Sequence, residues 1–142
     1  MNHSSQIPVA DIEILSGNIF NVTATSGSEI TLDCAKRLIS ATNDLLYPNI
    51  PYRGGIYDLT AITYIHADAR EYLASGQDVI GKVVGVGLIS SSSLGKLMGN
   101  IFLKLSRPKD FPMRVFDSPI RAEHWVRSKM DIALSTPEKK AA

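Results

Sequence analysis

The residues that could do chemistry in this sequence are few and scattered. The three histidines, His3, His66 and His124, have no metal-ligand spacing. The sequence places no serine, cysteine or second histidine to complete a nucleophile and base pair. Cys34 is the only cysteine, so an internal disulfide and a thiolate metal cluster within one chain are excluded. These observations predict a protein that is not an enzyme and that has no cofactor and no metal site. A small hydrolase is the remaining enzymatic alternative.

The main candidate for a functional surface is the segment 55–73, which predicts a buried strand, a short polar crossing and a helix that begins near Asp68. Asp58 falls near the carboxyl end of the strand, the edge at which ligands and partners usually meet open α/β sheets. Asp68 with Glu71 three residues later is a variant of the capping box, so Asp68 is the predicted N-cap. Asp68 either caps the helix only or also contacts a partner, and His66 is interpreted as an exposed turn residue.

A second apolar strand, residues 82–90, carries two glycines on one face. Because glycine has no side chain to hold a neighbour away, either a helix packs unusually close there or a small cavity opens. The cavity would serve an alternative function, the binding of a small molecule or lipid. Its candidate residues are Gly85, Gly87, Ser91, Gly95 and Gly99. The serine run 90–93 that follows the strand is expected to cap the next helix, because it lacks the glycine spacing of a phosphate-binding loop.

The elements that must position these residues follow from periodicity and turn signals. Strands are predicted at 11–15, 19–24 and 113–116, and helices after Thr31, over 94–105 and from Pro119, with Trp125 as anchor of the last helix. Strands that alternate with helices need crossovers, which give parallel pairing. The predicted fold class is therefore α/β, with a mixed, mostly parallel sheet of about five strands, an N-terminal antiparallel hairpin and four helices. One domain over 11–134 would follow an extension at 1–10 and precede a disordered tail at 135–142.

Composition restricts the class of protein. The chain has 142 residues, 44% of them hydrophobic and 20% charged, which is ordinary for a soluble globular domain. The net charge of +1 gives no argument for nucleic acid. There are four Lys and Arg against nine Asp and Glu up to residue 81, and eleven against five after it. The acidic and basic halves of the chain either mix on the surface of the folded protein, or their opposite charges orient a partner. No apolar run approaches a membrane span and no secretory signal is visible, so the expected location is the cytoplasm.

Together, the order of elements and two short motifs resemble a known family. The motifs are the strand end Asp58-Leu59-Thr60 leading through Tyr64-Ile65 into a helix, and the closing strand over residues 111–116. They are similar to those of STAS-like domains, and more narrowly of small bacterial SpoIIAA-like proteins, whose shape is also related to a lipid-binding fold. The resemblance covers roughly residues 11–130.

The resemblance implies a regulatory module that binds a protein partner or pairs with itself as a homodimer. In the anti-sigma-factor antagonists of the family, the turn after the central strand reads Asp-Ser-Ser-Gly and its second serine is phosphorylated. Residues 66–69 fall on that motif, and Asp68 stands where the phosphorylated serine would be. A permanent charge replaces the switch, which argues against control by a kinase. The implied partner surface consists of Asp58, Thr60, His66, Asp68 and Arg70.

Overall fold

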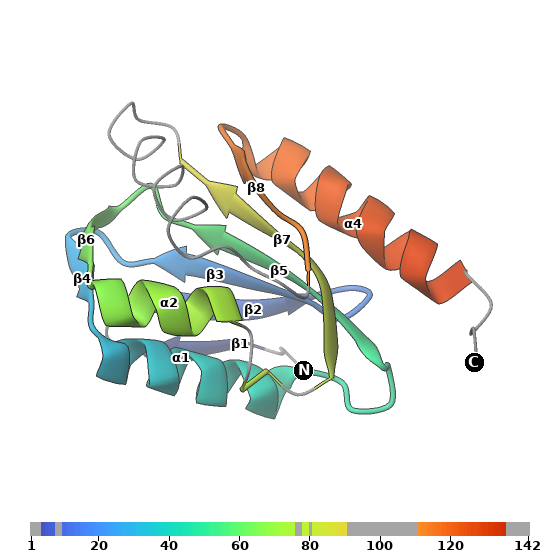
Figure 1. Ribbon diagram of the computed structural model, residues 1–142, viewed down its shortest axis with the longest axis horizontal. Coiled ribbons are helices and arrows are strands. Elements are labelled where there is room, and N and C mark those ends of the chain that lie inside the picture. The colour runs from blue at the N-terminus through green and yellow to red at the C-terminus, as the bar shows by residue number, and fades with distance from the viewer. Residues whose placement is uncertain (1–3, 8–9, 76–77, 80, 91–110, 136–142) are drawn as a thin grey trace.

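A six-stranded sheet forms the centre of the protein (Figure 1). The computed structural model describes residues 4–7, 10–75, 78–79, 81–90 and 111–135. The strands of the sheet, in spatial order, are β1 (Ser4–Ile7), β2 (Ala10–Leu15), β3 (Ile19–Ala24), β5 (Tyr52–Asp58), β7 (Lys82–Ile89) and β8 (Met113–Phe116). The first three are antiparallel, and β3, β5, β7 and β8 run parallel. The predicted mixed, mostly parallel α/β sheet is thus confirmed.

The number of elements differs from the prediction. The main sheet has six strands rather than about five, because β1 lies within the segment assigned to the extension and pairs with β2. A separate two-stranded sheet, β4 (Ser28–Ile30) with β6 (Ile62–Ile65), was not predicted. The described residues contain three helices, α1 (Leu32–Leu45), α2 (Ala67–Ser75) and α4 (Pro119–Ser135). The helix predicted over 94–105 and the tail from 136 onward lie outside the described residues.

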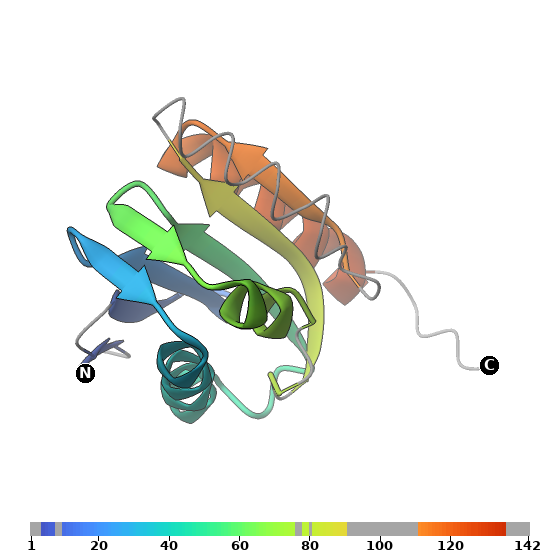
Figure 2. The same cartoon turned by 60° about the vertical axis from the view of Figure 1, so that its left-hand side comes forward.

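The helices cover opposite faces of the sheet. Figure 2 shows α1 and α2 side by side on one face and α4 on the other. The larger hydrophobic cluster lies under α1 and α2 and includes Phe20, Leu38 and Leu88. A smaller cluster joins the sheet to α4 through fully buried Val126 and Ile19.

Helix α1 begins where the sequence predicts. Thr31 has an extended backbone and its hydroxyl accepts a hydrogen bond from the Cys34 amide at 3.2 Å, so the predicted N-cap is confirmed. Asp33 follows in the first turn, where a carboxylate interacts favourably with the positive end of the helix. Leu38 and Ile39 are buried on the face toward the sheet. The apolar periodicity of this segment therefore determines which side of α1 packs.

A buried asparagine, Asn18, connects the turn between β2 and β3 to the loop before β5 by hydrogen bonds. Asn18 is fully buried and has a positive φ of 67°. Its side-chain Nδ2 donates to the carbonyls of Tyr47 and Tyr52 at 3.3 and 3.2 Å, and its Oδ1 accepts from the Tyr47 amide at 2.8 Å. Asparagine suits this position because it tolerates the left-handed backbone region and offers both donors and an acceptor. The turn between β2 and β3 is thereby tied to the loop that leads into β5.

Candidate functional site

The start of α2 carries the central candidate residue, Asp68. The Arg70 amide donates to the His66 carbonyl at 2.9 Å, so the helix begins at Ala67 and Asp68 is its second residue. The predicted N-cap role of Asp68 is therefore wrong. The reason is that β6 continues up to Ile65 and the chain enters the helix directly after His66. The Asp68 carboxylate still accepts a hydrogen bond from the Ala69 amide at 2.7 Å, and it remains exposed at the positive end of the helix.

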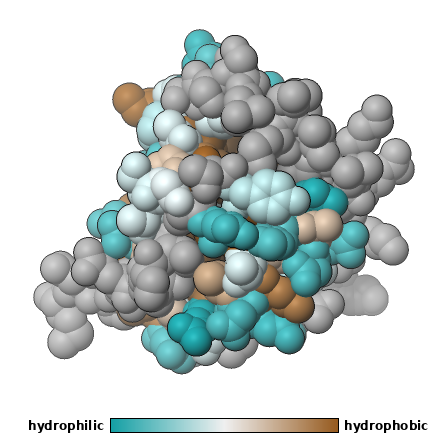
Figure 3. Space-filling model, turned by 90° about the vertical axis from the view of Figure 1, so that its left-hand side faces the viewer, coloured by the Kyte–Doolittle hydropathy of each residue, from teal (hydrophilic) through white to brown (hydrophobic). Residues whose placement is uncertain are grey.

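His66 belongs to a small polar cluster that the sequence did not reveal. Its Nε2 lies 2.5 Å from the Glu29 carboxylate of β4, and the ring of Tyr64 meets its imidazole edge to face at 5.1 Å. We call Glu29, Tyr64 and His66 the β4–β6 cluster. Its side chains are half-exposed or exposed, and Tyr64 is 52% exposed despite its size. Figure 3 shows that this end of the molecule is largely hydrophilic where it is described.

The chemistry available to this cluster is limited. An imidazole paired with a carboxylate could act as a base for a nearby nucleophile. Within the described part of the chain, however, no hydroxyl or thiol forms a hydrogen bond with His66. A group of three or more His, Cys, Asp or Glu side chains that could hold a metal is likewise not found among the described residues. The arrangement is suited to polar contacts with another molecule.

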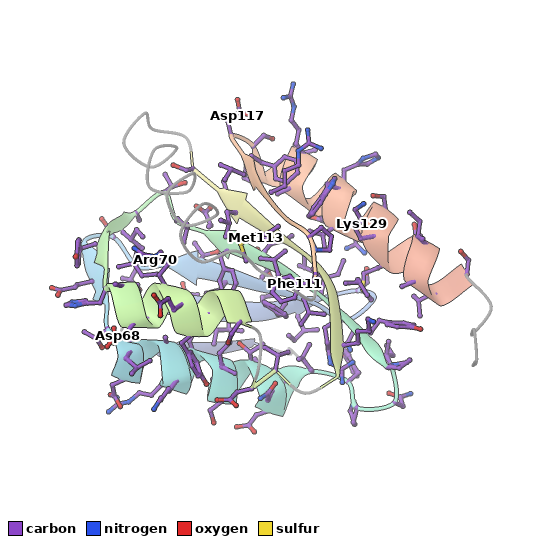
Figure 4. All side chains as sticks on the ribbon, viewed as in Figure 1. Asp68, Arg70, Phe111, Met113, Asp117 and Lys129 are labelled. Atoms are coloured by element: carbon purple, nitrogen blue, oxygen red, sulfur yellow. The ribbon has the colours of Figure 1, made fainter. Side chains whose placement is uncertain are left out.

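The five residues implied as a partner surface do not form one patch. Asp58 ends β5, and its Oδ1 accepts from the Thr60 amide at 3.0 Å, a local turn that starts the crossing to β6. His66 and Asp68 lie at the other end of β6. Arg70 lies one helical turn after His66, and its amide donates to the His66 carbonyl (Figure 4). Asp68 is two positions from each of them and is directed to a different side of the helix. The first turn of α2, with Asp68 and Arg70, therefore follows directly after the β4–β6 cluster, while Asp58 and Thr60 form a separate turn.

The glycine face of β7 is covered by α4. A Cβ at Gly87 would lie 3.4 Å from the Ala122 Cβ, and one at Gly85 would lie 3.2 Å from the Lys129 side chain. These are close or tight van der Waals distances, so the described residues leave no cavity beside the two glycines. Close packing, the first of the two predicted explanations, accounts for this face. Ser91, Gly95 and Gly99, the other candidates for a ligand cavity, lie outside the described residues.

A small apolar cavity does exist on the opposite face of the sheet. It has a volume of about 30 Å³ and is lined by side chains that include Tyr57, Leu38 and Leu88. This volume holds about one water molecule, and ordinary ligand pockets are at least about ten times larger. Tyr57 is buried, and its burial, with a contribution from Tyr72, raises the pKa of its phenol well above the usual value. As lined by the described residues, this cavity is too small for an ordinary ligand.

Trp125 lies differently from its predicted position. The sequence predicts that this tryptophan anchors α4 in the core, whereas the buried residues of α4 are Ala122, Val126 and Met130. Trp125 is half-buried at the flank of the helix, with its ring tilted against Phe116 at a centroid distance of 5.6 Å. The buried stripe of α4 therefore does not include the tryptophan.

None of the helices within the described ranges has the length and hydrophobicity of a membrane span.

Comparisons with known proteins agree with this fold. A solved structure of an anti-sigma factor antagonist from Mycobacterium paratuberculosis superimposes with a TM-score of 0.55 at 18% sequence identity, covering 87% of this chain and 99% of that one. An uncharacterized protein of the DUF3478 family from Shewanella loihica PV-4, described as having a SpoIIAA-like fold, gives a TM-score of 0.50 at 16% identity, covering 86% and 98%. No curated protein matches the chain in sequence.

These likenesses establish the fold, which is STAS-like and SpoIIAA-like as the sequence resemblance implied. A family model described as "Domain of unknown function (DUF7793)" matches residues 12–129. This range includes most of β2, the elements from β3 to β8 and most of α4. Because the match spans most of the chain, the protein belongs to this DUF7793 family.

Proposed function

We propose that the protein is a non-enzymatic, STAS-like regulatory domain that binds a protein partner through the start of α2 and the β4–β6 cluster. One observation carries this proposal. Asp68, a carboxylate that cannot be switched off by a phosphatase, is exposed in the first turn of α2 at the position where the family resemblance places a phosphorylatable serine. The name of the solved antagonist states that it acts against an anti-sigma factor. This supports a protein as the partner class.

The local structure supports such a surface. Glu29 and Asp68 both present carboxylates, and the hydrogen bond between Glu29 and His66 ties the β4–β6 sheet to the start of the helix. The exposed ring of Tyr64 adds contact area at low entropic cost, which is typical of interface residues. The site is built on strands and a helix rather than on a long loop, so little order has to be created on binding. A partner with basic or donor-rich groups would complement it.

The experiment is an affinity isolation from the organism's own cells followed by native mass spectrometry of the complex. We expect one stoichiometric protein, or a second copy of the chain, to be retained by the wild type. The substitutions Asp68→Arg and Tyr64→Ala should both release it. Asp131→Arg is the matched control, because Asp131 is an exposed carboxylate on α4 at the opposite face of the sheet.

Two results would count against the proposal. Retention of the partner by Asp68→Arg at wild-type affinity would exclude the start of α2 as the contact surface. Turnover of a substrate that depends on His66 and Glu29 would show that the cluster is catalytic. The alternative function, a binder of small molecules or lipids, requires the cavity beside Gly85 and Gly87. That space is filled by α4 where the structure describes it, so we do not extend the proposal to it.

A further inference from the structure

A second concave region lies far from the proposed partner surface. It is a groove of about 730 Å³ between β8 and the amino-terminal half of α4. Its size is within the range of ordinary binding sites. The side chains that give it its character are Arg114, Phe116, Asp117, Arg121, His124 and Trp125. Helices α4 and α2 lie on opposite faces of the sheet (Figures 1 and 2), so the groove beside α4 is separate from the surface at α2.

Stacked cations and aromatic rings form one wall of the groove. The Arg114 guanidinium lies 5.5 Å from the centre of the Phe116 ring, and Phe116 packs against Trp125. The Lys129 ammonium lies 5.5 Å from the centre of the Trp125 ring. Cation–π contacts of this kind hold the charged groups over the rings while their N–H groups remain able to donate to a ligand. The cations are thus partly positioned before a ligand arrives.

The charge of the groove is positive. Arg114, Arg121 and Lys129 line or border it, and Asp117 is the one acidic residue among the described residues of its lining. The Arg121 guanidinium is 3.9 Å from the Asp117 carboxylate, and both side chains are more than half exposed, so this pair is weak. Figure 4 shows Asp117 at the end of β8 and Lys129 along α4. An occupant of this groove should therefore be negatively charged.

The outer edge of β8 adds a second feature. The Val86 and Ser90 amides of β7 and its end donate to the Pro112 and Phe116 carbonyls, at 3.0 and 2.9 Å. Backbone groups alternate sides along a strand, so those of Met113 and Val115 are directed away from β7. No strand among the described residues pairs with this edge. The groove therefore combines positive side chains with a strand edge that can accept another strand.

We propose that this groove binds an extended, acidic peptide segment of a partner protein, which adds a strand to the outer edge of β8. Main-chain hydrogen bonds at Met113 and Val115 would supply the strand pairing, and the alternate side chains of the peptide would face the groove. Its carboxylates would form bidentate pairs with Arg114 and Arg121. The apolar faces of Phe116 and Trp125 would pack on the side chains between them. This site is independent of the surface at α2.

A second copy of the chain fits this edge less well. Two-fold pairing of β8 with its own copy would bring the two Arg114 side chains, and the two Arg121 side chains, toward each other. Like charges that face each other across strands or interfaces are destabilising. The charges of the groove therefore favour an acidic segment of a different protein.

The test uses a synthetic acetylated octapeptide in which glutamate alternates with valine and threonine, titrated into isotope-labelled protein. We expect NMR shifts at the Met113 and Val115 amides and in the first half of α4. Replacing every glutamate of the peptide by glutamine, or methylating its alternate amide nitrogens, should each weaken binding by about tenfold or more. The substitution Arg121→Glu should weaken it similarly. Lys36→Glu makes the same charge change at an exposed side chain of α1 and should leave the affinity unchanged.

Any of the following outcomes would overturn the proposal. Equal binding of the glutamine peptide would show that charge is not recognised, and equal binding of the methylated peptide would show that no strand is added. If inorganic phosphate produced the same shifts and displaced the peptide at equal concentration, the groove would be a site for small anions. A concentration-dependent dimer that Arg121→Glu abolishes in sedimentation experiments would make a second copy the occupant. Shifts confined to α2 would place peptide binding at the other surface.

Discussion

A size series at Gly87 tests the packing of α4 on the sheet. A Cβ at this position would be 3.4 Å from the Ala122 Cβ and 3.5 Å from a methyl group of Val126, which is ordinary contact. Gly87→Ala should therefore fit, and because alanine restricts the unfolded chain, it should stabilise the protein by about 0.4–1 kcal/mol. Gly87→Val places two further methyl groups where Ala122 and Phe116 already lie. This overpacking should cost about 1–3 kcal/mol.

The assay is urea denaturation followed by circular dichroism, with thermal melts as a second measure. For a chain of this length each kcal/mol corresponds to about 3–4 °C in Tm, so the alanine and valine variants should separate by several degrees. Gly54→Ala is the matched comparison, because its Cβ would lie 2.5 Å from a Val126 methyl group and must displace it. We expect this variant to be destabilised even though the added group is the same.

Two results would contradict this packing of α4 against β7. If Gly87→Val were at least as stable as the wild type, space for two methyl groups would have to exist beside β7. That outcome would restore the cavity that the ligand-binding alternative requires. A loss of stability in Gly87→Ala as large as that in Gly54→Ala would instead show that α4 packs closer to Gly87 than described.

Three further predictions concern stability. Asn18→Ala should destabilise the protein in urea titrations, because it leaves the Tyr47 and Tyr52 carbonyls without their donor, at about 1–3 kcal/mol for each group, and because alanine is strained at a φ of 67°; a loss below about 1 kcal/mol would contradict this. Trp125→Ala should cost less than the roughly 3–5 kcal/mol typical of a fully buried aromatic residue, since the ring is half-buried; a thermal melt showing the full loss would restore it as the anchor. Burial raises the pKa of Tyr57, and burial with the Asp78 hydrogen bond raises the pKa of Tyr72 to about 12. Tyrosines of the unfolded chain ionise and release protons at about pH 10, before these two do so in the folded protein. The free energy of unfolding should therefore fall as the pH rises from about 10. Tyr57→Phe should reduce this alkaline loss, and an unchanged pH profile would contradict it.

Much of the fold could be predicted because its signals are local. The cap at Thr31, the strand over residues 82–89 and the start of α4 after Ser118 each depend on a few neighbouring side chains and on their alternation or helical spacing. Parallel pairing could be predicted because a helix between two strands returns the chain to the same end of the sheet, so that both strands run in the same direction. The STAS-like fold was therefore accessible from the sequence.

The boundary at α2 shows where local reasoning failed. Asp68 followed by Glu71 fits a capping box, but the actual start of the helix is set by β6, which pairs with β4 more than 30 residues earlier in the chain. The backbone amide of His66 donates to the Ile30 carbonyl at 3.0 Å. This long-range bond fixes His66 at the end of the strand, so the cap position of the helix is His66, two residues before the predicted Asp68.

The sequence by itself determined the strands β2, β3, β5, β7 and β8, the helices α1, α2 and α4, and the STAS-like fold that they form. Only the tertiary structure decided which side chains share a surface. The pairing of Glu29 with His66, the coverage of Gly85 and Gly87 by α4, and the groove between β8 and Trp125 all join residues that are distant in the chain. Their proximity depends on which strands are neighbours in the sheet and on which face of the sheet each helix covers. The residue pattern within one segment specifies neither of these long-range choices.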